Sequence, residues 1–498
     1  MRKLSKSKII AFRQCPKRLW LEVHRPDLKD DSGSEVVFAI GNQVGEIAQT
    51  IYDTNQDGYL IEIDKIGWEA AYEKTETWLT NNDAPLFEAA LKIPGGLALA
   101  DVMLSDDQNG QKGWRMIEVK SSTGVKDYHH DDIAVQTYIA EQSGIPLTSV
   151  ALAHVDNTFV YPGGGNYVGL LAEVDLTAEA KSRSEEVAGW FKEAHTTIEQ
   201  TQEPDIEPGP QCQHPFTCSF CNHCIPEKEQ TEYPLTSFHR LRSNRREALE
   251  ANGYQDVREV PTSELSGLNL RIQEQTIKGE SYFDQEGAAA ALIQFPGQPR
   301  FLDFETISFA VPIWAGTRPY TQLPFQFSLH HLDENEELHH HEFLDLTGDD
   351  PRQAFAVALV EHCGQSGPIF AYNAPFERRV IRDLIQSFPE QAAALQAIHD
   401  RVEDLLPIAR NFYYHPSQHG SWSLKAVLPA ICPDLSYSEL DGVQDGHLAQ
   451  QAYLEAIAPE AAPARKEEIN RQLLKYCELD TFALVRMWEI FRGDSPSS

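Results

Sequence analysis

The sequence has no run of apolar residues long enough to cross a bilayer. Its first twenty residues lack the apolar core and the small-residue cleavage site of a secretory signal. We therefore expect a soluble, cytoplasmic protein with no membrane partner. Basic residues are scarce, since 42 lysines and arginines stand against 75 acidic residues, for a formal net charge of −33. This balance argues against broad, non-specific affinity for polyanions, although basic residues are concentrated locally at 2–25 and 239–246.

Cysteine is also rare, with eight in 498 residues, but it is unevenly distributed. Cys212, Cys218, Cys221 and Cys224 fall within thirteen residues, and Cys15 stands alone near the N-terminus. In a reducing cytosol, clustered cysteines are more often metal ligands than disulfides. We predict that Cys15 meets the other four at one metal centre.

The length predicts two or three domains. We place a first domain at residues 1–230, a helical connector at 231–297 and a second domain at 298–498. The cysteine cluster marks the end of the first domain, and a new apolar strand marks the start of the second.

The connector pattern predicts one helix over residues 235–253, ended by Gly253, and a second helix over 262–278. A helix, a glycine turn and a short helix resemble a helix-hairpin-helix, which binds the sugar–phosphate backbone. A plain helical linker is the alternative interpretation.

Acidic residues in the first domain recur on successive predicted strands, at Glu88, Asp101 and Glu118, and Lys120 follows Glu118 by two positions. Residues two apart share a face of a strand, so Glu118 and Lys120 should point into the same site as Asp101. Carboxylates at a strand end suit a hard divalent cation such as Mg²⁺ or Mn²⁺. A neighbouring lysine can orient a water molecule or stabilise negative charge on a phosphate.

This pattern resembles the PD-(D/E)XK nuclease superfamily in its RecB-like branch. Asp101 matches the lone aspartate, Glu118-Val119-Lys120 matches the E-x-K, and Gln136 matches the helix motif. The resemblance implies an α/β nuclease core in which Gln136 helps to hold the lysine and the scissile phosphate. Many members have a metal-binding histidine on the early helix, but residues 41–46 contain none. Either Glu88 replaces it or fewer side chains hold the metal.

A sub-branch of these nucleases, which includes the CRISPR-adaptation nuclease and the AddB subunit, carries an iron–sulfur cluster. One cysteine precedes the nuclease core and three follow it. Cys15, Cys212, Cys218 and Cys224 match that layout and leave Cys221 spare, whereas the alternative set replaces Cys212 with Cys221. A [4Fe–4S] cluster needs four thiolates, and Zn²⁺ is the competing interpretation. Either metal would act as a structural staple, because it closes a very long loop.

The second domain begins with an apolar strand over residues 301–306 that carries Asp303 and Glu305 on one face. Buried strands rarely accept two acids without a metal or another partner. Further helices are predicted near residues 351–364, 389–410 and 447–458.

The order of acids in this domain resembles the DEDD exonucleases of the DnaQ type, in a ribonuclease H-like fold. The first motif is matched by Asp303 and Glu305, the second by Glu377, and the third by Tyr476 and Asp480. The resemblance implies that the acids hold two cations while Tyr476 orients a water molecule. Glu377 departs from the aspartate of the family. Either the backbone compensates, or Asp404 contributes, or the metal site is weakened.

Together these patterns predict a divalent-metal-dependent nuclease with two active sites, acting on DNA more than RNA, in DNA repair or in defence against foreign DNA. Partner proteins of a repair or defence complex are possible. The alternative hypothesis is a partly or wholly degenerate nuclease that binds nucleic acid as a subunit of a larger complex. The missing histidine and Glu377 favour that alternative.

Overall fold

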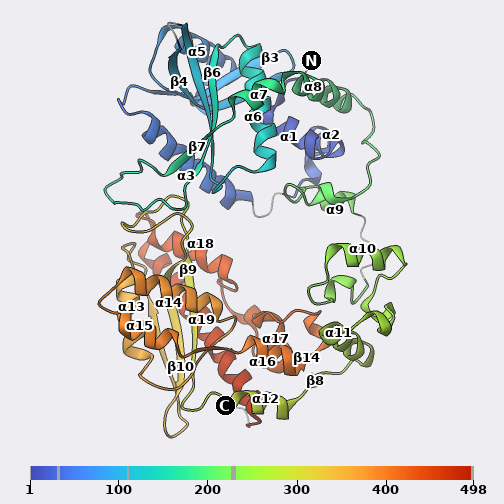
Figure 1. Ribbon diagram of the computed structural model, residues 1–498, viewed down its shortest axis with the longest axis vertical. Helices are drawn as coiled ribbons and strands as arrows, with labels where there is room; N and C mark the ends of the chain where they lie inside the picture. Colours follow the sequence, from blue (N-terminus) through green and yellow to red (C-terminus); the bar gives the residue numbers. More distant parts are fainter. Residues whose placement is uncertain (1, 31–33, 109–110, 226–230, 495–498) are drawn as a thin grey trace. The chain divides into compact units, whose positions relative to one another are not determined.

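The chain folds as two compact units, and in each of them helices cover a β-sheet (Figure 1). This architecture confirms the predicted α/β class. Unit 1 comprises residues 1–228 and 309–321, and unit 2 comprises residues 229–308 and 322–498. No helix among the described residues combines the length and the apolar character needed to cross a membrane. The computed structural model describes residues 2–30, 34–108, 111–225 and 231–494.

The sheet of unit 1 has the order β2-β3-β4-β5-β6-β7, with β1 paired to β4. β3, β4 and β5 are antiparallel neighbours, β6 runs parallel to β5, and β7 runs antiparallel to β6. The strands are β1 (Leu4–Ser5), β2 (Tyr59–Leu60), β3 (Leu86–Ile93), β4 (Gly96–Gln108), β5 (Gln111–Lys120), β6 (Leu147–Val155) and β7 (Leu171–Asp175).

One face of this sheet packs against α1, α5, α6 and α8, because the side chains of alternate strand residues such as Trp114 and Met116 meet the apolar stripes of those helices. α3 contributes to the opposite face. The helices of unit 1 are α1 (Lys6–Gln14), α2 (Pro16–His24), α3 (Ser34–Tyr52), α4 (Ile63–Ile66), α5 (Trp68–Asn81), α6 (Asp127–Gln142), α7 (Thr177–Ser182), α8 (Ser184–Ile198) and α9 (Cys221–Cys224).

Residues 309–321 belong to unit 1, although the sequence places them in the second domain. Ala310 and Val311 are buried in one apolar cluster with Val44 and with residues that follow β6. Backbone hydrogen bonds hold the segment as well, because the Gly316 amide donates to the carbonyl of Tyr161 at 2.7 Å. No local pattern in the sequence could reveal this packing, since its partners lie more than a hundred residues away.

The sheet of unit 2 has the order β11-β10-β9-β12-β13. β10 runs antiparallel to both β9 and β11, whereas β12 runs parallel to both β9 and β13. A separate two-stranded sheet pairs β8 with β14. The strands are β8 (Tyr282–Phe283), β9 (Arg300–Ile307), β10 (Leu323–Leu332), β11 (Leu338–Leu344), β12 (Ile369–Ala371), β13 (Val402–Asp404) and β14 (Tyr413–Tyr414).

The alternation of side chains along β9 determines which of its residues lie on each face of the unit 2 sheet. Leu302 and Phe304 of β9 pack against α13 and α14 on one face, and Phe301 packs against α19 on the other. Asp303 and Glu305 therefore lie on the α19 face. The helices of unit 2 are α10 (Ser243–Ala251), α11 (Gly267–Lys278), α12 (Gln285–Leu292), α13 (Arg352–His362), α14 (Pro375–Ser387), α15 (Ala392–His399), α16 (Leu406–Phe412), α17 (Leu424–Ile431), α18 (Gly446–Ile457) and α19 (Pro463–Arg492).

The predicted connector at 231–297 is part of unit 2 and not a separate element. Its side chains Phe238, Leu249 and Ile272 share one buried cluster with Phe301 of β9 and Trp488 of α19. This shared core explains why the connector does not form an independent linker.

Three predicted helices differ from the structure. The helix over 235–253 is wrong in its first part, because Arg240 takes a positive φ of 48° and α10 begins only at Ser243. The helix over 262–278 begins at Gly267, after Ser266 in extended conformation. The helix over 389–410 is interrupted by β13, where pairing with β12 overrides the local helical pattern.

We predict that Gly420→Ala destabilises the protein strongly. Gly420 has a φ of +74°, and a Cβ there would lie 1.7 Å from the carbonyl oxygen of Ser237, at the start of the connector. Gly253→Ala is the matched control, because Gly253 has a φ of +90° but open space around it. In urea unfolding, the control should lose ~1–2 kcal/mol of its free energy of unfolding, and Gly420→Ala should lose ~1–3 kcal/mol more than the control. Equal losses would contradict the close packing of the connector.

Candidate functional site

Three of the predicted metal-binding acids of unit 2 converge. Asp303 and Glu305 of β9 and Asp480 of α19 each offer a carboxylate oxygen, and these atoms all lie within 4.8 Å of one another. They line a cleft of about 610 Å³ together with Tyr476 and Glu377. The cleft therefore brings together every unit 2 residue that the three motifs singled out as catalytic or metal-binding.

The acids in this cleft resist ionisation. Loss of hydration raises the pKa of Asp303 well above its usual range, and the neighbouring Asp480 and Glu305 raise it further. Burial also raises the pKa of Glu305, with Asp480 adding to the effect, and it raises the pKa of Asp480 to about 6. Carboxylates held this close share one site and cannot all ionise without a compensating cation.

Glu377 lies at the start of α14 and is 2% exposed. Burial raises its pKa to about 8, and its Oε2 has no hydrogen-bond partner among the described residues. Asp404 is not among the described residues that line the cleft. Its Oδ1 accepts hydrogen bonds from the amides of Asn373 at 3.0 Å and Leu406 at 2.9 Å, so it organises the backbone around Glu377.

Three further residues near these acids are not among the predicted catalytic and metal-binding residues. The Tyr437 hydroxyl donates a hydrogen bond to the Asp480 carboxylate. Lys425 lines the cleft, and its Nζ lies 5.6 Å from the ring centre of Tyr476. The Sγ of Cys477 lies 3.7 Å from Oδ2 of Asp303. Cys477 carried a local signal, because it directly follows the motif tyrosine, whereas Tyr437 comes from a separate short element.

In unit 1, Glu118 and Lys120 project from β5 toward α6, as strand alternation predicts. The Lys120 Nζ lies 2.7 Å from Oε1 of Glu118, and it lies 2.5 Å from Oδ2 of Asp132 on α6. Asp101 of β4 accepts a hydrogen bond from the Val119 amide at 2.7 Å. Burial, reinforced by Glu118, raises the pKa of Asp101 to about 8. The charged groups of Asp101, Glu118 and Lys120 therefore lie near one another, but among the described residues Asp101, Glu118 and Glu88 do not bring three ligand atoms within 4.8 Å.

Lys6 and Asp132 are the residues of this site that the sequence did not reveal. The Lys6 Nζ lies 2.6 Å from Oε1 of Glu118 and 2.6 Å from Oε1 of Gln136, which is fully buried. Pairing of β1 with β4 positions Lys6 at the first turn of α1. Burial opposes the charge on Lys6, but Asp132 and Glu118 outweigh it and raise the pKa of the ammonium group.

Glu88 takes a φ of +56° in the middle of β3. On the paired strand, Ala100 and Met103 face the same core although they are three residues apart, so the alternation of faces changes near Asp101. Burial raises the pKa of Glu88, and Glu118 raises it further. A strained backbone at a cluster of acids is typical of functional sites.

All five predicted cysteines line one small cavity in unit 1. Cys15 lies between α1 and α2, and Cys218 is buried. Burial raises the pKa of Cys224 to about 11, with further contributions from Cys218, Cys15 and Cys212, which Lys17 opposes. The Cys221 thiol donates a hydrogen bond to the carbonyl of Cys212 at 3.5 Å.

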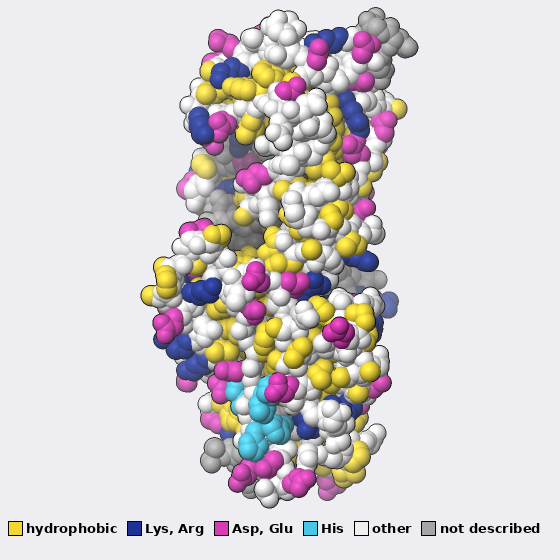
Figure 2. Space-filling model, turned by 90° about the vertical axis from the view of Figure 1, so that its left-hand side faces the viewer, with side chains coloured by type: hydrophobic (Ala, Val, Ile, Leu, Met, Phe, Trp, Pro, Cys, Tyr) yellow, Lys and Arg dark blue, Asp and Glu magenta, His cyan; other side chains and the backbone are white. Residues whose placement is uncertain are grey.

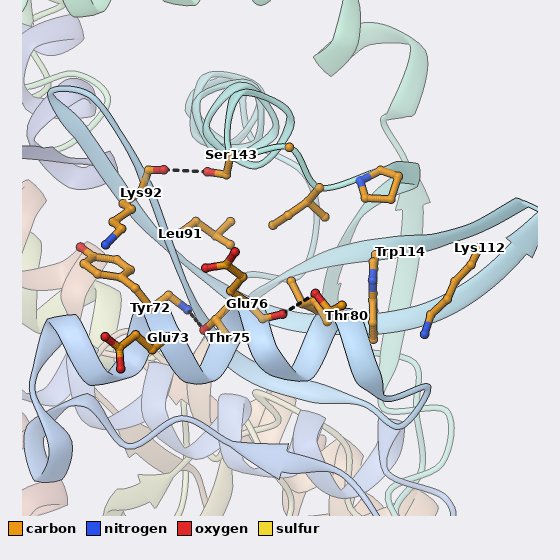
Figure 3. Close-up of a pocket in the computed structure, with 15 residues that line it drawn as sticks. Tyr72, Glu73, Thr75, Glu76, Thr80, Leu91, Lys92, Lys112, Trp114 and Ser143 are labelled. Atoms are coloured by element: carbon orange, nitrogen blue, oxygen red, sulfur yellow. Dashed lines mark hydrogen bonds between the residues drawn. The ribbon is translucent and has the colours of Figure 1, made fainter.

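A separate groove of about 440 Å³ lies among α5, β3, β5 and the loop that follows α6 (Figure 3). Two hydroxyls along it are engaged with the backbone, because the Ser143 Oγ donates to the carbonyl of Lys92 at 2.9 Å and the Thr75 Oγ1 accepts from the Ala90 amide at 3.0 Å. None of the predicted site residues is among the described residues that line this groove.

We predict that Asp303→Asn stabilises the metal-free protein and abolishes its stabilisation by Mn²⁺. A carboxyl group whose pKa is higher in the folded than in the unfolded state lowers the free energy of unfolding as the pH rises above its unfolded-state pKa of about 3.9. Asparagine at this position removes one of the charges that repel one another. In urea unfolding, the free energy of unfolding of the variant should exceed that of the wild type by ~1 kcal/mol at pH 8 and by less at pH 5.

Thermal unfolding with and without Mn²⁺ should then separate the two effects, with exposed Asp349→Asn as the charge-matched control. A less stable metal-free Asp303→Asn variant, or one that Mn²⁺ still stabilises as it does the wild type, would contradict the interpretation.

Two comparisons bear on these sites. A family model described as a domain of unknown function (DUF2779) matches residues 300–423, a range that contains Asp303, Glu305 and Glu377 but ends before Tyr476 and Asp480. The chain is 26% identical over 216 residues to a protein of Mycoplasma pneumoniae (strain ATCC 29342 / M129 / Subtype 1) described as "Uncharacterized protein MG366 homolog". The alignment covers 39% of this chain and 32% of that relative, so the chain spans about a third of the relative's length.

Proposed function

We propose that this protein is a divalent-metal-dependent nuclease with a DEDD-type exonuclease site in unit 2 and a PD-(D/E)XK-type site in unit 1. The observation that carries the proposal is the convergence of Asp303, Glu305 and Asp480 within 4.8 Å, in a cleft that also contains Tyr476 and Glu377. The sheet order and strand directions of unit 2 are consistent with the ribonuclease H-like fold that the motifs resemble.

The acids of unit 2 have the properties expected of cation ligands. Their oxygen donors are the kind that Mg²⁺ and Mn²⁺ prefer, and the Oε2 of Glu377, which no described residue contacts by a hydrogen bond, is a buried acceptor available to a cation. A pair of such cations, when bound, would stabilise the attacking and leaving oxygens of a phosphodiester. Tyr437 fixes the Asp480 carboxylate by its hydrogen bond, while Tyr476 lies where it can orient a water molecule.

Basic side chains around the unit 2 cleft suit a polyanionic substrate despite the acidic composition of the chain. Arg240, Arg410 and Lys425 all line the cleft. His239 and Trp422 add aromatic surface, and their rings meet edge to face with centres 5.2 Å apart. Cations for the phosphates and rings for the bases are the usual components of a single-strand binding groove. DNA is the proposed substrate, in repair or in defence against foreign DNA, and RNA is an outcome of the test.

The unit 1 site supplies a second set of hydrolytic groups. Asp101 and Glu118 are its candidate ligands for a cation, and Glu88 is the acid that replaces the absent histidine of the early helix. Lys120 is held by Glu118 and Asp132, so its ammonium group is fixed where it can stabilise charge on a phosphate. Gln136 is buried, and its Nε2 has no partner among the described residues, which leaves a donor available.

We further propose that the cysteine cavity holds a [4Fe–4S] cluster, with Zn²⁺ as the alternative. The ligands would be Cys15, Cys212, Cys218 and Cys224, because the Cys221 thiol is hydrogen-bonded to a backbone carbonyl. Among the described cysteines no three sulfur atoms lie within 4.8 Å of one another. Sulfurs around a tetrahedral zinc ion would lie about 3.8 Å apart, given Zn–S bonds of about 2.3 Å. A cluster would tie the start of unit 1 to residues 212–224.

A second function is favoured by one observation in unit 1. The Lys6 ammonium group bridges Glu118, Gln136 and Asp132, and therefore neutralises acids that would otherwise need a cation. In that case unit 1 binds nucleic acid without cutting it, and unit 2 alone is the nuclease.

The decisive experiment uses 5′- and 3′-labelled single- and double-stranded DNA and RNA, with Mg²⁺ or Mn²⁺. Wild type, Glu118→Gln, Asp303→Asn and the double variant are compared, with Asp349→Asn as the control. We expect each single substitution to remove one class of product and the double substitution to lower the total rate at least about 100-fold. Activity that survives in the double variant would refute both sites. Wild-type products from Glu118→Gln would favour the binding role of unit 1.

The cysteine assignment predicts different outcomes for two serine substitutions. Anaerobically purified Cys221→Ser should retain wild-type iron and sulfide, whereas Cys224→Ser should lose the visible absorbance of the cluster and unfold at a lower temperature. Iron, sulfide and zinc analysis of the same samples identifies the metal. Colourless wild-type protein with one zinc ion would reject the iron–sulfur assignment, and loss of metal from Cys221→Ser alone would reject the ligand set.

A further inference from the structure

The hairpin formed by β10 and β11 is rich in histidine, and histidine side chains gather on the surface of unit 2 (Figure 2). Strand alternation separates these residues into two groups. His331, His339 and His341 lie on one face of the hairpin, where their rings stack and His341 meets His362 of α13. His330 and His340 are directly opposite each other on the two strands and share the other face, toward α19.

On the α19 face, His330, His340 and Glu478 form a three-ligand group. Each offers one ligand atom, and the three atoms lie within 4.8 Å of one another. The Nδ1 of His340 lies 3.9 Å from Oε1 of Glu478. His330 is buried and His340 is half-buried, whereas the Glu478 side chain is 51% exposed, so the group has a rigid inner side and an open outer side.

A chain of hydroxyl groups joins the two histidines behind this group. The Nδ1 of His330 lies 2.8 Å from Oγ1 of Thr481, and the Nε2 of His340 lies 2.8 Å from Oγ of Ser328. The two hydroxyl oxygens are 2.6 Å apart. Each imidazole therefore has one ring nitrogen engaged, and the other nitrogen of each ring is the one available to a ligand.

One assignment of the protons satisfies every hydrogen bond along this chain. His330 Nδ1–H donates to Thr481, and His340 Nε2–H donates to Ser328. The Ser328 hydroxyl then donates to Oγ1 of Thr481, whose own proton goes to the carbonyl of Glu478 at 3.2 Å. This assignment leaves lone pairs on Nε2 of His330 and Nδ1 of His340, the neutral forms that coordinate a metal.

We propose that His330, His340 and Glu478 bind a transition-metal ion of the Zn²⁺ class, in a site distinct from both nuclease sites. Two imidazoles and one carboxylate are a donor set that Zn²⁺ favours, with a fourth position left for water. Ser328 and Thr481 serve as the outer partners that fix the ring orientations, an arrangement usual for metal-ligating histidines. The site joins the β10–β11 hairpin to α19.

The position of the site in α19 gives the metal a structural role. Glu478 and Thr481 flank Asp480, which belongs to the acid cluster of the cleft, on the same helix. A metal at His330, His340 and Glu478 would therefore restrain the helix that positions Tyr476 and Asp480. This role does not depend on nuclease activity, since it concerns only the packing of a helix against a hairpin.

The test is zinc titration of the full-length protein in competition with a chromophoric chelator. His340→Gln removes a ligand but keeps an amide that can bond to Ser328, and His331→Gln is the matched control on the opposite face of the hairpin. We expect His340→Gln to lose one equivalent of bound zinc, or to bind it at least about 100-fold more weakly, while His331→Gln keeps it. Any zinc held by the cysteines is common to all variants and cancels in the difference.

Two further variants protect the test against a folding defect. Glu478→Gln alters an exposed side chain and should weaken zinc binding without changing the unfolding temperature of metal-free protein. Ser328→Ala should weaken zinc binding about 10-fold to 100-fold, because it removes only an outer partner. Equal zinc stoichiometry and affinity in wild type, His340→Gln and Glu478→Gln would overturn the proposal, as would a loss confined to His331→Gln.

Discussion

Repulsion among closely held carboxylates is the constraint that the fold of unit 2 must overcome. The packing of β9 against α19 holds Asp303, Glu305 and Asp480 together. Apolar side chains at these three positions would give a more stable fold. Two like charges 4 Å apart cost on the order of 4 kcal/mol at an effective dielectric constant of about 20. The surrounding core must supply that energy, and it does so through aromatic packing such as that of Phe301 against Trp488, with ring centres 5.8 Å apart.

Repulsion among the acids of unit 1 is offset in a different way. Its acids Glu118 and Asp132 are neutralised from within the chain by Lys6 and Lys120. In the unit 2 cleft the described basic side chains, Arg240, Arg410 and Lys425, line the cavity but form no ion pair with its acids. The two sites therefore differ in how much they need an external cation. Under the proposed function, this difference gives a physical reason for unit 2 to be the stronger hydrolase and for the internally neutralised site of unit 1 to be better suited to holding a substrate.

The candidate catalytic and metal-binding residues were predictable wherever they lie two apart on a strand or four apart on a helix. Asp303 with Glu305, Glu118 with Lys120, and Tyr476 with Asp480 all share a site, because these spacings place side chains on one face of a strand or helix. Lys6, Asp132 and Tyr437 were not predictable. Each reaches its site through the pairing or packing of an element that the motifs do not include.

Taken by itself, the sequence determined the α/β class and the faces of the strands, since these follow from side-chain periodicity. Its resemblance to iron–sulfur nucleases implied that Cys15 lies beside the distant cysteines, and all five line one cavity. Only the tertiary structure decided that residues 309–321 pack in unit 1, that the connector shares the core of unit 2, and that His330 and His340 face Glu478. These features rest on contacts between segments far apart in the chain. Such contacts are selected by the total burial and hydrogen bonding of the fold and not by any local pattern.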